Sequence, residues 1–140
     1  MKIKREIYND LIHDCPEAPP EVGGILGGNN GIVNVFVLDL PIDSNKNNCY
    51  IPNTEKLNAV LSVWSDEGID FYGIFHTHFP YGYSLSSDDE KYIDQIMNAM
   101  PLHIKTLFFP VVVPGDGMAS FKASRTSKAI RVKPDTITLI

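Results

Sequence analysis

Two stretches of the chain place apolar residues at the 3.6-residue interval of an amphipathic helix. They are residues 3–14, which stop before Pro16, and residues 54–67, which lie between Asn53 and Gly68. Proline ends a helix, asparagine is a preferred N-cap, and glycine accepts the left-handed conformation that closes a helix. We therefore predict two helices with these bounds.

Other stretches have the β-branched, aromatic or alternating pattern of strands. A strand from Glu21 enters a glycine-rich turn at 27–31 and a second strand at 32–40, which together predict a hairpin. No lysine follows these glycines, so the pattern favours a turn over a phosphate-binding loop. A loop is expected at 41–52. Further strands are expected at 70–78, 105–113, 118–123 and 130–140. The run 105–113 is apolar nearly throughout, which is typical of a strand buried on both faces.

This order of helices and strands predicts an α/β protein in which helices pack on a mixed sheet. The length of 140 residues indicates one domain, and 44% hydrophobic with 21% charged residues is typical of a globular protein. A net charge of −5 argues against nucleic acid or an anionic membrane as a partner. No apolar run is long enough to span a bilayer, and no export signal is seen, so we expect a cytoplasmic protein with reduced Cys15 and Cys49.

Candidate chemistry gathers in residues 76–89. His76 and His78 follow the apolar run 71–75, and alternation along a strand would point both imidazoles to the same face. Ser86 and Asp89 come next, at the start of a third amphipathic helix that ends before Pro101. Two imidazoles and one carboxylate form the ligand set of an open zinc site.

The residues at this helix start also have a purely structural interpretation. Ser86 with Asp89, and Ser87 with Glu90, each have the spacing of a capping box. Asp88 is adjacent to Asp89, points about 100° away from it in a helix, and can complement the helix dipole.

The spacing His-x-His-x7-Ser-x2-Asp resembles the JAMM (JAB/MPN+) zinc metalloproteases, in particular their compact stand-alone prokaryotic members. The family's first motif, Glu-x-x-Gly-x-Leu-x-Gly, is matched by Glu21, Gly24, Leu26 and Gly28. The resemblance covers essentially the whole chain. It implies a single JAB/MPN domain over 1–140, with a three-layer α-β-α fold around a mixed curved sheet, similar to cytidine deaminases.

The resemblance also implies roles for five residues. Zn²⁺ is expected on His76, His78 and Asp89, with Glu21 as the general base and Ser86 as the donor to the oxyanion. The implied reaction is hydrolysis of a peptide or isopeptide bond. The implied substrate is a ubiquitin-like or sulfur-carrier protein, released after a C-terminal Gly-Gly.

Several alternatives stay open at this point. The same residues would serve a hydrolase of another amide, such as a cell-wall peptide, and some MPN domains are non-catalytic scaffolds. Glu17 is a second candidate for the base. Thr77 and Phe79 stand where many family members have serine and proline. Tyr81 and Tyr83, between the expected ligands, either line a groove for an extended tail or pack over the end of the sheet.

Overall fold

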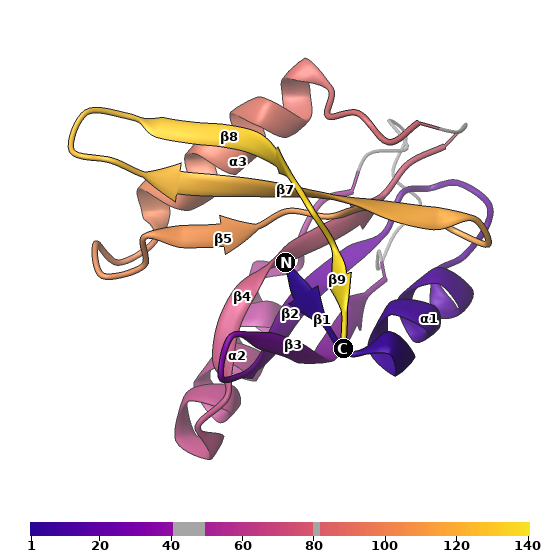
Figure 1. Cartoon of the computed structure of the whole chain (residues 1–140), viewed down its shortest axis with the longest axis horizontal. Helices are drawn as coiled ribbons and strands as arrows, with labels where there is room; N and C mark the ends of the chain where they lie inside the picture. Colours follow the sequence, from indigo (N-terminus) through magenta and orange to yellow (C-terminus); the bar gives the residue numbers. More distant parts are fainter. Residues whose placement is uncertain (41–49, 80–81) are drawn as a thin grey trace.

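The computed structural model describes residues 1–40, 50–79 and 82–140 (Figure 1). The helices are α1 (Arg5–Asp14), α2 (Thr54–Glu67) and α3 (Ser87–Ala99). The strands are β1 (Lys2–Ile3), β2 (Gly23–Asn29), β3 (Ile32–Asp39), β4 (Asp70–Thr77), β5 (Thr106–Phe108), β6 (Val111–Val113), β7 (Gly117–Arg125), β8 (Ile130–Asp135) and β9 (Thr138–Leu139). They form one mixed sheet in the order β5-β7-β6-β4-β2-β3-β1-β9, with β8 paired to β7. The α/β class predicted from the sequence is confirmed.

The β2–β3 hairpin forms where the glycine-rich turn was predicted. Its two turn residues, Asn30 and Gly31, have φ of 55° and 75°. A two-residue hairpin turn of this kind requires positive φ at both positions, which asparagine tolerates and glycine adopts freely. On its other side β2 pairs antiparallel with β4, and Gly23 lies opposite His76. This register brings the start of β2 beside the histidines.

The caps of α2 are also as predicted. The Asn53 side chain accepts a hydrogen bond from the Lys56 amide at 3.2 Å, and Gly68 has a φ of 73°. The first helix begins at Arg5, two residues later than predicted, because residues 2–3 form β1. This strand lies parallel between β3 and β9. Of the predicted loop 41–52, residues 41–49 lie outside the described part of the chain.

Two of the predicted strands are each divided in two. The run 105–113 is interrupted at Phe109 and Pro110, although both halves, β5 and β6, pair with β4 on one side and β7 on the other. Proline has no N–H group to donate to a ladder, which breaks the regular pairing there, although the Phe109 amide still donates to the Phe121 carbonyl at 2.8 Å. The stretch 130–140 divides into β8, which pairs with β7, and β9, which pairs with β1. The predicted strand 118–123 extends at both ends to become β7.

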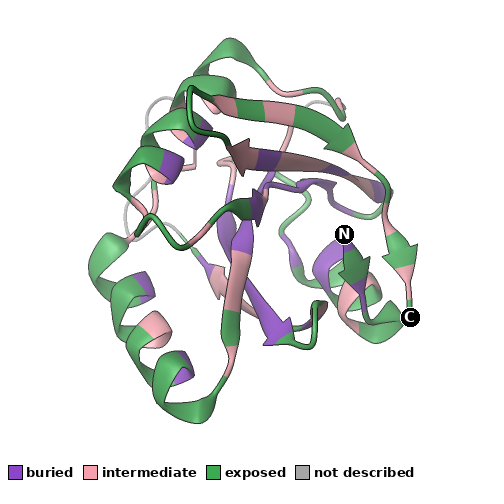
Figure 2. Cartoon of the chain, turned by 60° about the vertical axis from the view of Figure 1, so that its left-hand side comes forward, coloured by how far each residue is buried: buried purple, intermediate pink, exposed green. Residues whose placement is uncertain are grey.

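Successive residues of the central strands face opposite sides of the sheet. Leu26 and Phe75 pack into the core that includes α1, whereas Ile25 and Ile74 pack into the core that includes α2 and α3. The helices turn their buried faces toward the sheet (Figure 2). The sheet therefore has α1 on one face and both other helices on the opposite face.

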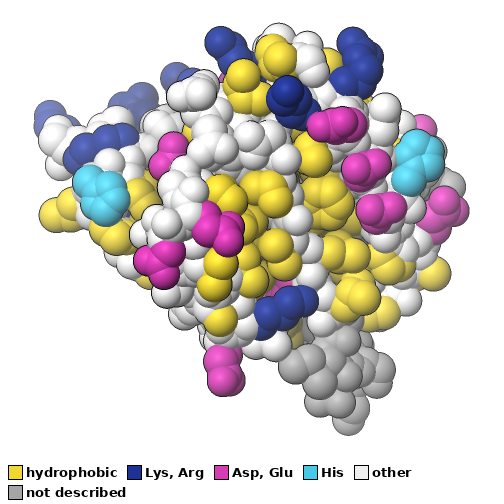
Figure 3. All heavy atoms as spheres, turned by 90° about the horizontal axis from the view of Figure 1, so that it is seen from below, with side chains coloured by type: hydrophobic (Ala, Val, Ile, Leu, Met, Phe, Trp, Pro, Cys, Tyr) yellow, Lys and Arg dark blue, Asp and Glu magenta, His cyan; other side chains and the backbone are white. Residues whose placement is uncertain are grey.

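The surface seen from below carries apolar side chains at its centre, with acidic and basic side chains around them (Figure 3). None of the helices that the structure describes has both the length and the apolar character needed to cross a membrane.

Candidate metal centre

The two histidines lie at the end of β4. His76 belongs to the strand, and the His78 amide continues the pairing by donating to the Val112 carbonyl at 3.1 Å. Thr77, between them, is fully buried on the other face. Its hydroxyl accepts a hydrogen bond from the Val22 amide at 2.9 Å and lies 3.3 Å from the Val22 carbonyl. Thr77 thus fixes the start of β2, directly after Glu21, against the strand that carries the histidines.

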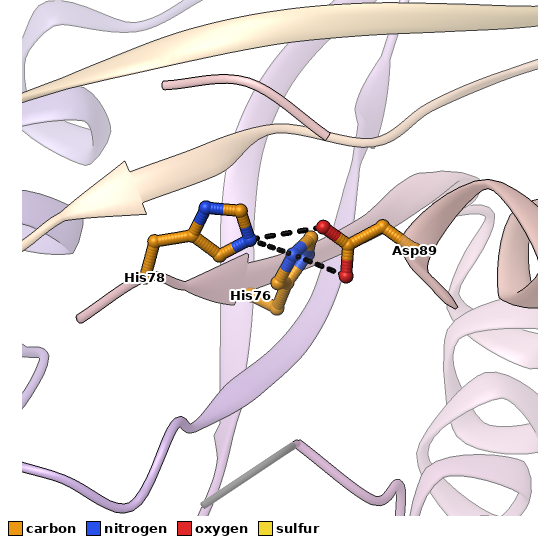
Figure 4. Close-up of side chains that lie close together, drawn as sticks. All are labelled: His76, His78 and Asp89. Carbon is orange, nitrogen blue, oxygen red and sulfur yellow. Dashed lines mark hydrogen bonds and ion pairs between the residues drawn. The ribbon is translucent and has the colours of Figure 1, made fainter. Parts of the chain in front are cut away.

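Three polar side chains converge at one point: His76 from β4, His78 directly after it, and Asp89 from α3 (Figure 4). His76 Nε2 lies 2.9 Å from His78 Nε2 and 3.2 Å from Asp89 Oδ1, and His78 Nε2 lies 3.0 Å from Asp89 Oδ2. With metal–ligand bonds of about 2.0–2.1 Å, the ligand atoms of a tetrahedral zinc site stand about 3.3–3.4 Å apart. The observed separations are slightly shorter than these. The sequence prediction that these three residues come together agrees with this geometry, and side chains of all three could hold a metal ion.

The tautomer of His78 follows from its second ring nitrogen. His78 Nδ1 lies 3.1 Å from the Gly82 carbonyl, which can only accept, so Nδ1 carries the proton. In the neutral ring Nε2 then presents a lone pair. That lone pair faces the Asp89 carboxylate, which is also an acceptor. A cation between the two, either a proton or a metal ion, removes the repulsion.

The charges of the site are strongly coupled. Burial raises the pKa of Asp89, but hydrogen bonds from His76, His78 and the Ser86 amide outweigh burial and hold this pKa well below its usual range. The hydrogen bond to Asp89 raises the pKa of His78, and burial offsets part of the increase. The site therefore favours an ionised carboxylate beside a positive charge.

The first turn of α3 orients the carboxylate. Ser86 is the N-cap: its Oγ accepts from the Asp89 amide at 3.1 Å, and Asp89 Oδ2 accepts from the Ser86 amide at 2.8 Å. Of the two predicted capping boxes, this pair forms the cap, and Ser87 is the first helical residue. Because capping uses Oγ as an acceptor, the Ser86 hydroxyl hydrogen can still be donated into the site.

A cavity of about 340 Å³ opens over the three converging side chains. Its lining consists of Glu21, Tyr50, His76, His78, Phe79, Ser86, Asp88, Asp89 and Tyr92. All five residues predicted for the site belong to it. Asp88 also reaches the cavity, but Asp89 is the residue whose carboxylate meets the imidazoles.

The structure separates the two candidate bases. Glu21 is half-buried in the cavity, where burial raises its pKa and the nearby imidazoles lower it. Glu17 does not line the cavity. Its carboxylate lies against the β6–β7 turn, where a Cβ added to Gly115 would stand 3.0 Å from Glu17 Oε1. A base must reach the reacting atoms, and Glu21 is the glutamate placed to do so.

Sequence reasoning missed the residues that support Glu21. The Tyr50 backbone lies beside Glu21 and lowers the pKa of its carboxyl slightly, against the larger effect of burial. The Tyr50 hydroxyl donates to Oδ2 of Asp39 at 2.9 Å, and the Asn53 amide donates to the same oxygen at 2.9 Å. Asp39 is only 2% exposed. The one signal in the sequence was Asp39 itself, a carboxylate at the end of an apolar strand. Such a group needs polar partners when the strand is buried.

Tyr83 does not line the cavity. Its hydroxyl donates to the Asp116 carboxylate in the β6–β7 turn. Tyr83 therefore does not form the predicted groove wall, and it packs into neither apolar core, so its contact is this hydrogen bond to the turn. Tyr81 lies outside the described residues, as does Cys49. Cys15 is buried beside α1, and burial raises the pKa of its thiol to about 12.

Comparison with known proteins identifies the fold and no more. No family model and no curated protein matches the chain. Protein DSY2949 from Desulfitobacterium hafniense has a similar solved structure, with a TM-score of 0.67 and 16% identity over 99% of this chain and 92% of that one. A protein from Salinibacter ruber (strain DSM 13855) has a TM-score of 0.58 and 16% identity over 100% and 92% of the two chains. At this identity the likeness concerns the fold alone.

Proposed function

We propose that this protein is a zinc-dependent hydrolase of peptide or isopeptide bonds, of the JAMM type that its sequence resembles. The sheet flanked by helices on both faces is compatible with the MPN arrangement, which forms part of the proposal. The observation that carries it is the arrangement of His78, whose Nε2 lone pair points at Asp89 Oδ2 from 3.0 Å, with His76 Nε2 2.9 Å away. Two imidazoles and an ionised carboxylate at one point match the ligand set of catalytic zinc.

The donor set fits zinc better than calcium or magnesium, which prefer oxygen ligands. His76, His78 and Asp89 would hold the ion, on the side of α3 that faces the cavity. When bound, zinc lowers the pKa of water and polarises a carbonyl group.

Two residues of the cavity would move or hold protons. Glu21 is partly desolvated, so its pKa is raised, and it can accept the proton of the attacking water and return it to the leaving amine. Ser86 caps α3 with its oxygen, so its hydroxyl hydrogen is available for the oxygen on which negative charge develops.

The form of the cavity favours an extended substrate. A volume of about 340 Å³ accommodates a few residues of a narrow chain and no folded domain. Aromatic side chains of Tyr50, Phe79 and Tyr92 contribute to its walls. A tail that ends in glycines fits such a space, because only glycine lets the backbone approach closely. We propose the C-terminal tail of a ubiquitin-like or sulfur-carrier protein as the substrate.

The test compares the cleavage of two substrates by the zinc-loaded enzyme and by a zinc-loaded variant. Fusions that differ only in Gly-Gly or Ala-Ala before the scissile bond are incubated with the enzyme and with the Glu21→Gln variant. We expect faster cleavage after Gly-Gly and none by the variant. Equal cleavage of both fusions would support a general amide hydrolase, and no cleavage of either would reject these substrates.

A further inference from the structure

Two consecutive residues between His78 and Asp89, Gly82 and Tyr83, each form a hydrogen bond to another part of the chain. The Gly82 carbonyl accepts a hydrogen bond from His78 Nδ1 at 3.1 Å. The hydroxyl of the next residue, Tyr83, donates to the carboxylate of Asp116, 33 positions further along the chain. One side of this short segment therefore contacts a candidate ligand, and the other contacts the β6–β7 turn.

The β6–β7 turn, which the Tyr83 hydroxyl contacts, is itself fixed by backbone hydrogen bonds. The Asp116 amide donates to the Val113 carbonyl at 3.0 Å, which closes the turn. The Gly115 amide donates to the Ile12 carbonyl at 3.0 Å, which ties the turn to the end of α1. A Cβ added to Gly117 would stand 2.9 Å from the Tyr83 hydroxyl oxygen, so glycine leaves the space that this hydroxyl occupies.

Packing alone does not explain Tyr83. Its exposed fraction is 39%, and it belongs to neither of the two apolar cores. A hydrogen bond at such an exposed position contributes little to global stability. Its position directly after Gly82, the acceptor for His78, suggests a local effect on the metal centre.

We propose that Tyr83 and Asp116 are positioning residues of the metal centre, which hold the Gly82 carbonyl against His78 Nδ1 so that Nε2 stays turned toward the ion. This inference rests on the proposed zinc site. The hydrogen bond keeps the proton of the neutral ring on Nδ1. Without it, Asp89 would compete for that proton at Nε2, 3.0 Å away, and the lone pair needed for the metal would be lost.

The expected effect is moderate. Loss of a direct hydrogen-bond partner of a ligating histidine typically weakens metal affinity by about 10–100-fold. Tyr83 acts one residue further away, through a single neutral donor, so we expect roughly 3- to 10-fold weaker zinc binding in Tyr83→Phe. Asp116→Ala removes the other partner of the same hydrogen bond and should have a similar effect, with little added in the double variant.

Tyr72 offers a matched control. Its hydroxyl lies 3.4 Å from Asp70 Oδ2 and accepts from the Gly31 amide, near the far end of β4 from the histidines. Tyr72→Phe removes the same chemical group from another tyrosine–aspartate pair, although Tyr72 itself is partly buried against the core that includes α1. It should leave zinc affinity unchanged.

The experiment has two readouts on the full chain. Zinc affinity is measured by competition with a chromophoric chelator, and the His78 tautomer is measured by ¹⁵N NMR of metal-free protein at a pH where the ring is neutral. We expect Tyr83→Phe and Asp116→Ala to weaken zinc binding and to move protons from Nδ1 to Nε2. Wild-type affinity and wild-type tautomer populations in both variants would overturn the proposal, and so would an equal loss in Tyr72→Phe.

The two proposals fail in different ways. If the wild-type protein takes up no zinc, the zinc proposal fails, and the tautomer comparison in metal-free protein still decides whether Tyr83 orients His78. Thermal unfolding of the chelator-treated variants shows whether each one is folded. Should Tyr83→Phe unfold, the proposal is tested with two other variants instead. Asp116→Ala removes the acceptor, and Gly117→Ala places a Cβ against the Tyr83 hydroxyl.

Discussion

His78 Nε2 lies 3.0 Å from Oδ2 of Asp89, although the proton of the neutral imidazole is held on the opposite side of the ring by the Gly82 carbonyl. Two acceptors therefore face each other unless a cation lies between them. In metal-free protein a proton can supply this cation only while the His78 ring is charged, and the attraction between the charged ring and the carboxylate raises the pKa of His78 and lowers that of Asp89. A metal ion would compete with this proton for the same place.

The first prediction concerns the pH dependence of stability in chelator-treated protein. The raised pKa of His78 contributes stability that is present below the unfolded value of about 6.5 and is lost as pH rises through the folded value. The lowered pKa of Asp89 contributes stability above the unfolded value of about 3.9. The melting temperature of wild type should therefore exceed that of His78→Gln by more at pH 5.5 than at pH 8.5. An equal or larger difference at pH 8.5 would show that the pair is not coupled.

The second prediction separates the base from the metal ligands. Glu21→Gln should keep zinc binding and the fold, because Glu21 is not one of the three converging groups, and it should abolish turnover. Zinc content and single-turnover cleavage are the measurements. Glu17→Gln is the control. Glu17 lies against the β6–β7 turn, so this variant should cleave the substrate at the wild-type rate. The reverse pattern would assign the base to Glu17.

The third prediction concerns the two roles of Ser86. Ser86→Ala should lower kcat by roughly 10²–10³, the usual loss for one oxyanion donor. It should also lower the free energy of unfolding by about 0.5–2 kcal/mol, because it removes the N-cap of α3. Ser86→Thr retains the hydroxyl and should preserve both properties. A Ser86→Ala variant that loses stability and keeps its kcat would leave Ser86 as a cap only.

The fourth prediction concerns the buried support of Glu21. Tyr50→Phe removes one hydrogen bond to Asp39 and should lower the free energy of unfolding by about 1 kcal/mol in urea titrations. Asp39→Ala should cost more, because it leaves both the Tyr50 hydroxyl and the Asn53 amide without their buried acceptor. An Asp39→Ala variant as stable as wild type would show that this network is not structural.

The convergence of the three candidate metal ligands could be predicted from the sequence because their geometry is local. His76, His78 and Asp89 fall within 14 consecutive residues of a strand, a loop and a helix start, and strand alternation fixes the direction of both imidazoles. The ends of α2 were predictable for the same reason, since Asn53 and Gly68 act on their own neighbours.

The parts that were not predictable depend on pairing between distant residues. The two-residue strands β1 and β9 exist only because the two ends of the described chain lie side by side in the sheet, with Lys2 opposite Thr138. The contact of Tyr50 with Asp39 and that of Tyr83 with Asp116 likewise join segments whose proximity is a result of the fold. No local pattern of residues indicates either contact.

The most direct measurement is the zinc content of purified and reconstituted protein, determined by elemental analysis for wild type and for variants of the site. We predict one zinc ion per chain in wild type and in Asp88→Ala, whose carboxylate does not join the imidazoles, and loss of zinc in His76→Ala, His78→Ala and Asp89→Ala. Wild-type protein that remains free of zinc after reconstitution, or an Asp89→Ala variant that binds zinc as tightly as wild type, would contradict the assignment of this site.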